Sequence, residues 1–294
     1  MRIELRVSNV NDKFIAWQHR AIDQRNPPPQ AQPHLTPHRY IKMTRFPSLY
    51  SVSIEDLISK YGATLFRSAI ARFATVWRNP QITRLRLEQD IQDVHIPFTT
   101  VSVYHRIRYR DKTFEVPTVD SIQIRPNRMD KKGQTIAGRF DTALVHYGNG
   151  ERMGIHGEPL SMHTSTILKK LLLAYGIAQV RVIFSINKTA AKLLFGERNL
   201  PPHHLAYVQW FTPFQANSEP KTGLYKVSHL IQNNDPVVSI VPVSNIAQSV
   251  HLSPLPGCPM PRDWTSDIVV EKCDNFLVNS FSDDQTYLFF HNNK

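Results

Sequence analysis

The stretch Val101-Ser-Val-Tyr-His-Arg-Ile-Arg-Tyr-Arg110 decides the fold class, because its side chains follow a period of two. Val101, Val103, His105, Ile107 and Tyr109 alternate with Ser102, Tyr104, Arg106, Arg108 and Arg110. Side chains two positions apart in a strand point to one face of the sheet. The pattern therefore predicts a half-buried β-strand with three arginines on its outer face.

The same period continues over residues 94–294, where turn residues separate further short apolar runs. Strands are predicted near 119–124, 139–146, 177–186, 205–211, 224–229, 237–251 and 286–290. A short helix is predicted from Thr265 to Phe276, with Thr265-Ser-Asp as its cap. This part of the chain is predicted to be a mostly antiparallel β-barrel or sandwich with short helical inserts.

Residues 51–93 have a helical period instead. Ser53-Ile-Glu-Asp56 resembles a capping box, and Gly62 ends the helix that follows it. A second helix is predicted from Leu65 to Trp77, before Asn79-Pro80. A third is predicted from Thr83 to about Ile91, with Leu85 and Leu87 as its apolar anchors. The fold class is therefore α+β, with a small N-terminal helical subdomain before the β-domain.

Residues 1–50 are basic and rich in proline. They carry eight basic and three acidic residues, and the run Asn26-Pro-Pro-Pro-Gln-Ala-Gln-Pro-His-Leu-Thr-Pro-His38. Proline at this density fixes φ and removes backbone donors. A flexible tether is predicted for this segment.

The charge favours a polyanionic partner, because the formal net charge is +11. The candidate phosphate contacts are basic side chains of the strand quoted above and of the loop Arg125-Pro-Asn-Arg-Met-Asp-Lys-Lys-Gly133. They are Arg106, Arg108, Arg110, Arg125, Arg128, Lys131 and Lys132. Such contacts position nucleic acid without reading its sequence. A solvated strand face and turn explain the same pattern equally well.

Catalytic and metal-binding templates are missing from the sequence. It contains no G-x-S-x-G elbow, no G-x-x-x-x-G-K-[ST] phosphate loop and no H-E-x-x-H helix. Asp120 and Asp141 lie at predicted strand edges without the strand–helix alternation of a two-metal nuclease, and Asp141 is interpreted as a structural turn acid. His203 and His204 are adjacent, so they should face opposite ways and chelate poorly. We therefore expect no catalytic residue, no metal and no cofactor.

Cysteine usage and the N-terminus bear on the compartment. Cys258 and Cys273 are too few for a disulfide framework and lack zinc-ligand spacing. Met1-Arg-Ile-Glu-Leu-Arg lacks the apolar run of a signal peptide, and no stretch approaches the ~20 apolar residues of a membrane span. The expected setting is nuclear or cytoplasmic, without secretion or membrane insertion.

Several phrases in the order of the chain carry a family resemblance. They are Ser53-Ile-Glu-Asp-Leu-Ile-Ser-Lys-Tyr-Gly62, Ile96-Pro-Phe with Val103-Tyr-His, Gly138-Arg-Phe-Asp-Thr-Ala-Leu144, Ala178-Gln-Val-Arg-Val-Ile-Phe184, Leu205-Ala-Tyr-Val-Gln-Trp-Phe211, Gly223-Leu-Tyr-Lys-Val-Ser228, Ile240-Val-Pro-Val-Ser-Asn-Ile246 and Trp264-Thr-Ser-Asp. Together they resemble the C-terminal region of Plavaka-type, CACTA-like transposon proteins of mushroom-forming fungi, over roughly residues 45–290. In that family a DDE-type nuclease precedes this region, so the resemblance transfers no catalytic residue to this chain.

A weaker similarity concerns the fold. Tyr207-Val-Gln-Trp-Phe-Thr-Pro-Phe214, with the strands that follow it, looks like a bromo-adjacent homology (BAH) module. That family has a twisted β-barrel that binds protein or nucleosome surfaces. The similarity implies that the aromatic residues of this stretch are mostly core, with a partner groove among Tyr207, Trp210 and Phe214.

One segment departs from the resembled family. Glu158 to Ala174 intervenes where the family runs almost directly into Tyr175-Gly-Ile-Ala-Gln-Val-Arg181. One hypothesis is a translated intron, since Gly157-Glu158 can be encoded by GGTGAG, which contains a splice-donor-like GTGAG. The other is a short helix from Ser165 to Ala174. Both place an exposed insertion at 158–174.

The expected function is a non-catalytic accessory module of a transposon-encoded protein that binds DNA or a chromatin-associated protein. Two alternatives stay open. One is an interaction or oligomerisation module that holds transposase subunits together, and the other is a decaying remnant without selected function. An exposed aromatic patch around Trp210 or Phe214 would favour the interaction module.

Overall fold

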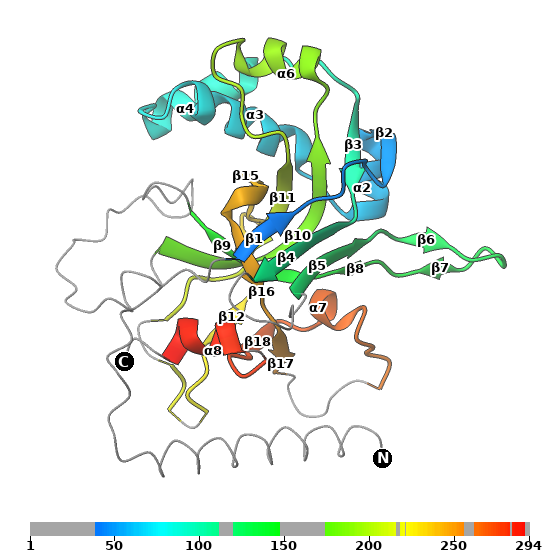
Figure 1. Ribbon diagram of the computed structural model, residues 1–294, viewed down its shortest axis with the longest axis vertical. Coiled ribbons are helices and arrows are strands. Elements are labelled where there is room, and N and C mark those ends of the chain that lie inside the picture. Colours follow the sequence, from blue (N-terminus) through cyan, green and yellow to red (C-terminus); the bar gives the residue numbers. More distant parts are fainter. Residues whose placement is uncertain are drawn as a thin grey trace. The chain divides into compact units, whose positions relative to one another are not determined.

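The long strand β10 (Tyr175–Ser185) lies at the centre of the fold (Figure 1). All of its residues after Tyr175 are buried, which suits a strand covered on both faces. The computed structural model describes residues 39–111, 120–147, 174–215, 218–220, 222–255, 262–282 and 284–291. Contacts divide the chain into Met1–Thr36, which lies outside these residues, and Pro37–Lys294.

The central sheet has seven strands, all paired antiparallel. On one side β10 pairs with β11 (Leu205–Trp210), and β11 pairs with β15 (Val238–Pro242). On its other side β10 pairs first with β9 (Thr142–His146) and then with β3 (Thr100–Tyr104). The outer neighbours are β16 (Ile246–Ser249) beside β9 and β2 (Leu49–Ser53) beside β3. Between β15 and β16 lies the 3-10 turn η2 (Val243–Asn245), so the strand predicted at 237–251 is interrupted.

A second sheet branches from the first at His105. There β3 ends, and the chain continues as β4 (Arg106–Asp111) in a four-stranded sheet of order β1-β4-β5-β8. Its other strands are β1 (Arg39–Lys42), β5 (Asp120–Arg125) and β8 (Arg139–Phe140). The tether predicted for 1–50 is wrong at its C-terminal end, because β1 and β2 lie there. Each of these strands is only four or five residues long and depends on pairing with a distant partner, which local composition does not reveal.

The predicted helices are confirmed. They are α2 (Ile54–Tyr61), α3 (Phe66–Arg78) and α4 (Arg84–Asp90), followed by η1 (Ile91–Asp93). The Ser53 side chain accepts a hydrogen bond from the Asp56 N–H at 3.0 Å, and Gly62 caps the other end of α2 with a φ of 68°. Leu85 is not an anchor, because it is 83% exposed. Helices α2 and α3 share one apolar core with the central sheet.

A further helix was not predicted. Helix α6 (Lys188–Phe195) follows β10 directly and buries Leu194 and Phe195. Asn187 caps it by accepting a hydrogen bond from the Ala190 N–H at 2.8 Å.

A second, smaller apolar cluster includes Leu144 of β9 and Ile177 of β10 in the central sheet. It is built by β12 (Lys226–Ser228), β18 (Asn275–Val278) and β17 (Leu252–Pro254), with α7 (Val269–Lys272) and α8 (Asp284–His291). The strand predicted at 286–290 is wrong: it is helix α8, which buries Thr286 and Phe290 one turn apart. The helix predicted from Thr265 to Phe276 is only α7, because Phe276 belongs to β18. Two short hairpins complete the described elements: β6 (Arg128–Met129) with β7 (Thr135–Ile136), and β13 (Ile231–Gln232) with β14 (Asp235–Pro236).

Arg181 on β10 ties these parts together from a buried position. Its Nε donates to the Tyr61 carbonyl at 2.8 Å, at the end of α2. Its Nη1 donates to Gln179 at 3.2 Å and also pairs with the carboxylate of Glu271 on α7. Burial lowers the pKa of Arg181, and Glu271 opposes that shift.

The described residues confirm an α+β fold with predominantly antiparallel sheets. Their sheets do not close into a barrel, because the path of the central sheet runs openly from β15 to β2. Within the same residues, no helix combines the length and apolarity needed to cross a bilayer. The predicted insertion, apart from Ala174, lies outside the described residues, as does Cys258.

Candidate nucleic-acid interface

The alternation predicted for the arginine strand is confirmed in β4. Ile107 and Tyr109 are 0% and 1% exposed, so they face the core. Arg106 is half-buried and Arg108 is exposed, on the opposite face of the strand. The backbone of Arg110 belongs to β4, while its side chain lies outside the described part of the structure.

Neighbouring strands add basic side chains to this outer face. Lys42 of β1 is directly opposite Arg108, and Arg125 of β5 is opposite Arg139 of β8. Directly paired residues project from the same side of a sheet. Arg125 shares its face with Gln123, and Gln123 is opposite Arg106. We call the outer surface of this sheet, with Lys42, Arg106, Arg108, Arg125 and Arg139, the arginine face.

Part of the arginine face closes around a pocket of about 560 Å³. Four arginines line it: Arg106, Arg125, Arg128 and Arg139. Among the described residues of the lining, Asp267 is the only acidic one. We call this the arginine pocket.

The arginines of this pocket are only partly satisfied by protein groups. The Nη2 of Arg106 donates to the Ser121 hydroxyl at 3.3 Å, while its Nε is buried without a hydrogen-bond partner in the described part of the chain. Arg125 donates to the Gln123 side chain at 3.2 Å, and Arg139 contacts Asp141 at 3.3 Å. A buried donor without a partner costs about 1–3 kcal/mol. The exposed guanidinium nitrogens around the pocket are the groups that could bind an anion.

Residues 125–133 were predicted to form a loop, and they instead begin a hairpin. Strands β6 and β7 pair and project from the sheet, with Arg128 at the base and Lys131 and Lys132 exposed at the tip (Figure 1). Asp130 shapes the tip, because its Oδ1 accepts from the backbone N–H groups of Lys132 and Gln134, each at 2.8 Å. The hairpin therefore extends the basic surface beyond the arginine face. Arg108, Lys131 and Lys132 do not line the arginine pocket.

A histidine also lines the arginine pocket. The Nε2 of His105 lies 2.9 Å from the Tyr61 hydroxyl. Burial lowers the pKa of His105 below its ordinary value. Burial, together with the charge of Asp56, raises the pKa of Tyr61 to about 12. The neutral imidazole is thus favoured beside the arginines.

The three aromatic residues assigned to a partner groove do not lie together. Tyr207 and Trp210 are 0% and 3% exposed within the larger core, where the Trp210 indole donates to Ser239 at 2.9 Å. Phe214 packs in the smaller cluster, edge to face with Tyr225 and Phe290. The structure thus corrects the groove assignment: β11 is a central strand, so its aromatic side chains fill the core.

The two acids at strand edges hold the backbone in place. Asp141 Oδ2 accepts from the Gln123 N–H at 2.8 Å, and Asp120 accepts from the backbone N–H and the hydroxyl of Ser249 at 3.1 and 2.5 Å. The contact of Asp141 with the backbone suits the structural role predicted for it. In the described part of the chain, no three or more His, Cys, Asp or Glu side chains are grouped to hold a metal ion. The rings of His203 and His204 lie edge to face, 4.7 Å apart.

Sequence reasoning missed three members of the site: Lys42, Arg139 and His105. Lys42 was assigned to the flexible segment, and His105 to the apolar face of its strand. Arg139 lies in β8, and only the β5–β8 register brings it to Arg125.

Comparisons with known proteins identified no relative of this chain. The chain matches no family model, no curated protein and no solved structure. The case for function therefore depends on the residues themselves.

Proposed function

We propose that the protein binds nucleic acid, DNA in the first place, through the arginine face and the β6–β7 hairpin. The observation that carries the proposal is the convergence of Arg106, Arg125, Arg128 and Arg139 on one pocket. Guanidinium groups have the donor geometry that phosphate oxygens accept. An isolated solvated strand face would not require four of them around one cavity.

The arrangement suits an extended polyanion better than a single small anion. The basic residues follow β1, β4, β5 and β8 across the sheet, and the hairpin carries Lys131 and Lys132 further along. Phosphate contacts spread in this way fix the position and direction of a duplex. The net charge of +11 adds long-range attraction to the same partner.

The lineage is part of the same proposal. A transposon-encoded accessory module, as the resemblance to Plavaka-type proteins implies, would hold DNA for a nuclease located elsewhere. The BAH-like similarity is proposed only for the antiparallel strands around β11, since the described sheets do not close into a barrel. A nuclear setting would follow from DNA binding. Sequencing the genomic locus tests the lineage, because an intact nuclease reading frame just upstream is expected.

The alternative function, a module that holds transposase subunits together, receives less support. It would be favoured by an exposed aromatic patch around Trp210 or Phe214, but Trp210 is only 3% exposed. Phe214 is partly buried against Tyr225 and Phe290.

The direct test is fluorescence anisotropy with a short labelled DNA duplex at low salt. The variant Arg106→Gln/Arg125→Gln/Arg128→Gln is expected to lose about tenfold or more in affinity, because three phosphate contacts disappear. The matched control Arg67→Gln/Arg78→Gln/Arg86→Gln removes the same charge from α3 and α4 and should change affinity by less than about threefold. No binding by the unaltered protein, or an equal loss in both variants, would refute the proposal.

A further inference from the structure

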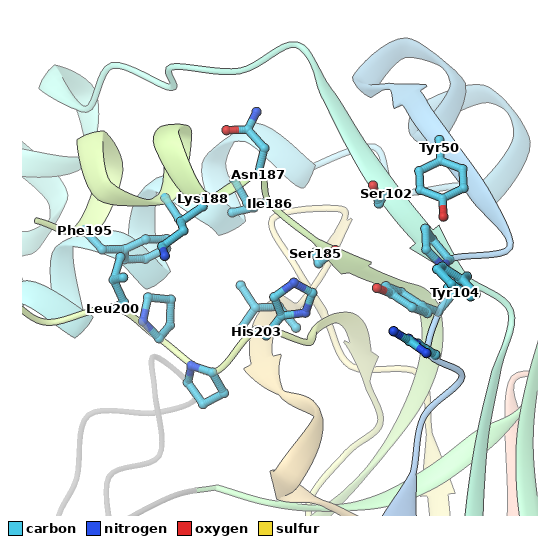
Figure 2. A pocket seen from close by; sticks show the side chains of 17 residues that line it. Tyr50, Ser102, Tyr104, Ser185, Ile186, Asn187, Lys188, Phe195, Leu200 and His203 are labelled. Carbon is cyan, nitrogen blue, oxygen red and sulfur yellow. The ribbon is translucent and has the colours of Figure 1, made fainter. Parts of the chain in front are cut away.

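A second pocket, of about 600 Å³, lies where β10 runs into α6. It shares no lining residue with the arginine pocket. In Figure 2, Tyr50, Ser102 and Tyr104 stand on one side and Lys188, Phe195 and Leu200 on the other, with Ser185 and His203 between them. We call it the aromatic pocket.

The polar base of the aromatic pocket is made by two serines. Ser185 at the end of β10 is directly opposite Ser102 of β3, so both hydroxyl groups project from one face of the sheet. Ser185 is only 6% exposed and lines the pocket. A hydroxyl group at this position can donate to or accept from a polar group of a ligand.

Aromatic rings form one wall of the aromatic pocket. The Tyr104 ring is held by the His204 ring, edge to face at 4.8 Å, and is 3% exposed. Tyr50 is 64% exposed and reaches the pocket through an irregular part of β2. There the pairing with β3 shifts between Leu49 and Val52, and Ser51 has a φ of 51°, in the left-handed region. Such bulges turn a side chain out of its regular direction, and they are frequent next to functional sites.

Positive charge is available at the rim of the aromatic pocket. Lys188 is the first residue of α6, directly after the cap Asn187, and its side chain is exposed. The N-terminus of the helix adds its partial positive charge at the same point. Arg45 also lines the pocket, with its guanidinium carbon 5.5 Å from the centroid of the Phe46 ring. In the described part of the lining, no side chain is acidic.

We propose that the aromatic pocket binds a nucleotide unit, with its base against the aromatic wall and its phosphate at Lys188. A flat aromatic group suits Tyr50, because aromatic side chains provide stacking platforms for any base. An anionic group suits Lys188 and Arg45, and a ribose or base polar atom suits the Ser185 hydroxyl. The same chemistry has two sources: a free nucleotide, or an unpaired nucleotide at the end of a nucleic-acid strand. The inference does not rest on the arginine face.

The test is isothermal titration calorimetry on the full chain with adenosine monophosphate and with a short single-stranded oligonucleotide. Tyr50→Ala and Lys188→Gln should each weaken binding roughly fivefold or more, and Tyr50→Phe should retain it. The controls are Leu49→Ala on the same strand and Lys192→Gln on the same helix, since neither residue lines the pocket. Both controls should bind as the unaltered chain does.

The two probes distinguish the sources of the ligand. Equal affinity for both assigns the site to a free nucleotide, while tighter binding of the oligonucleotide assigns it to a strand end. Binding should persist in Arg106→Gln/Arg125→Gln/Arg128→Gln, which separates this pocket from the arginine face. The inference is overturned if neither probe binds at millimolar concentration, or if Tyr50→Ala and Lys188→Gln bind like the controls.

Discussion

The guanidinium carbon of Arg181 lies 3.8 Å from the centroid of the Phe140 ring. Arg181 comes from the middle of the central sheet, and Phe140 comes from β8, next to Arg139 of the arginine face. The same guanidinium reaches the end of α2 through Tyr61 and α7 through Glu271. One buried cation therefore braces the sheet that carries the proposed interface.

Breaking the buried ion pair of Arg181 should therefore cost more stability than breaking an exposed ion pair. Glu271→Gln should lower the free energy of unfolding by about 1–3 kcal/mol, because a 7% exposed arginine side chain loses its counter-charge. The control is Glu197→Gln, which breaks the Lys192–Glu197 pair, with side chains 40% and 76% exposed, and should cost at most about 1 kcal/mol. Urea unfolding followed by circular dichroism measures both. Equal effects would show that Arg181 does not need Glu271.

A substitution at Gly62 also tests how much the position of Arg181 contributes to stability. The φ of Gly62 is 68°, and a Cβ added there would lie 2.2 Å from the Nη2 of Arg181. Gly62→Ala should therefore cost more than the roughly 1–2 kcal/mol of left-handed backbone strain alone. Gly133→Ala is the matched control, since its φ is 77° and no atom lies within 4 Å of the added Cβ. Thermal unfolding of the two variants should differ, and identical losses would mean that Arg181 moves aside freely.

The sequence predicted those parts of the fold and the site that depend on local pattern. The N-terminal cap at Ser53, the end of the helix at Gly62 and the alternation in β4 all concern residues within one element, and the structure confirms them. Helix α8 shows where local pattern fails. Its run Thr286-Tyr-Leu-Phe-Phe290 has the composition of a strand, yet Thr286 and Phe290 pack one helical turn apart, with Thr286 accepting from Gln248 at 2.9 Å.

The site was predictable only as the arginines of one strand and the basic residues of the segment at 125–133. Arg125 and Arg139 meet through the β5–β8 register, and Lys42 joins them through β1. Those pairings join segments that are distant in the sequence, so no periodicity records them. The aromatic pocket is similar, because Ser102 and Ser185 are unremarkable residues until β3 and β10 pair.

Acidification should weaken the fold through His105. Its pKa is lowered from the ordinary 6.5 by burial, so the unfolded chain binds a proton that the folded protein resists. This contribution to stability is present above about pH 6.5 and is lost as the pH falls towards the folded-state pKa. Four arginines line the same pocket, and Tyr61 contributes a neutral hydroxyl beside the His105 ring.

The variant His105→Gln should flatten this acidic loss of stability, measured as unfolding temperature between about pH 7.5 and about pH 5.5. His204 retains part of the dependence, because burial and His203 lower its pKa as well. His95→Gln is the control, since His95 is exposed. A pH profile unchanged by His105→Gln would contradict the assignment.

Substitutions at the tip of the β6–β7 hairpin should change DNA binding without changing stability. Lys131→Ser/Lys132→Ser should leave the unfolding temperature unchanged, because both side chains are exposed and Asp130 holds the turn through backbone N–H groups that remain. If both lysines bind phosphates, the slope of log affinity against log salt should become shallower by about 0.9 for each lysine removed. Anisotropy titrations at several salt concentrations measure the slope, with Arg78→Ser/Arg86→Ser as the control of equal charge. A slope that falls equally in both variants would show that net charge alone, and not the hairpin, attracts the DNA.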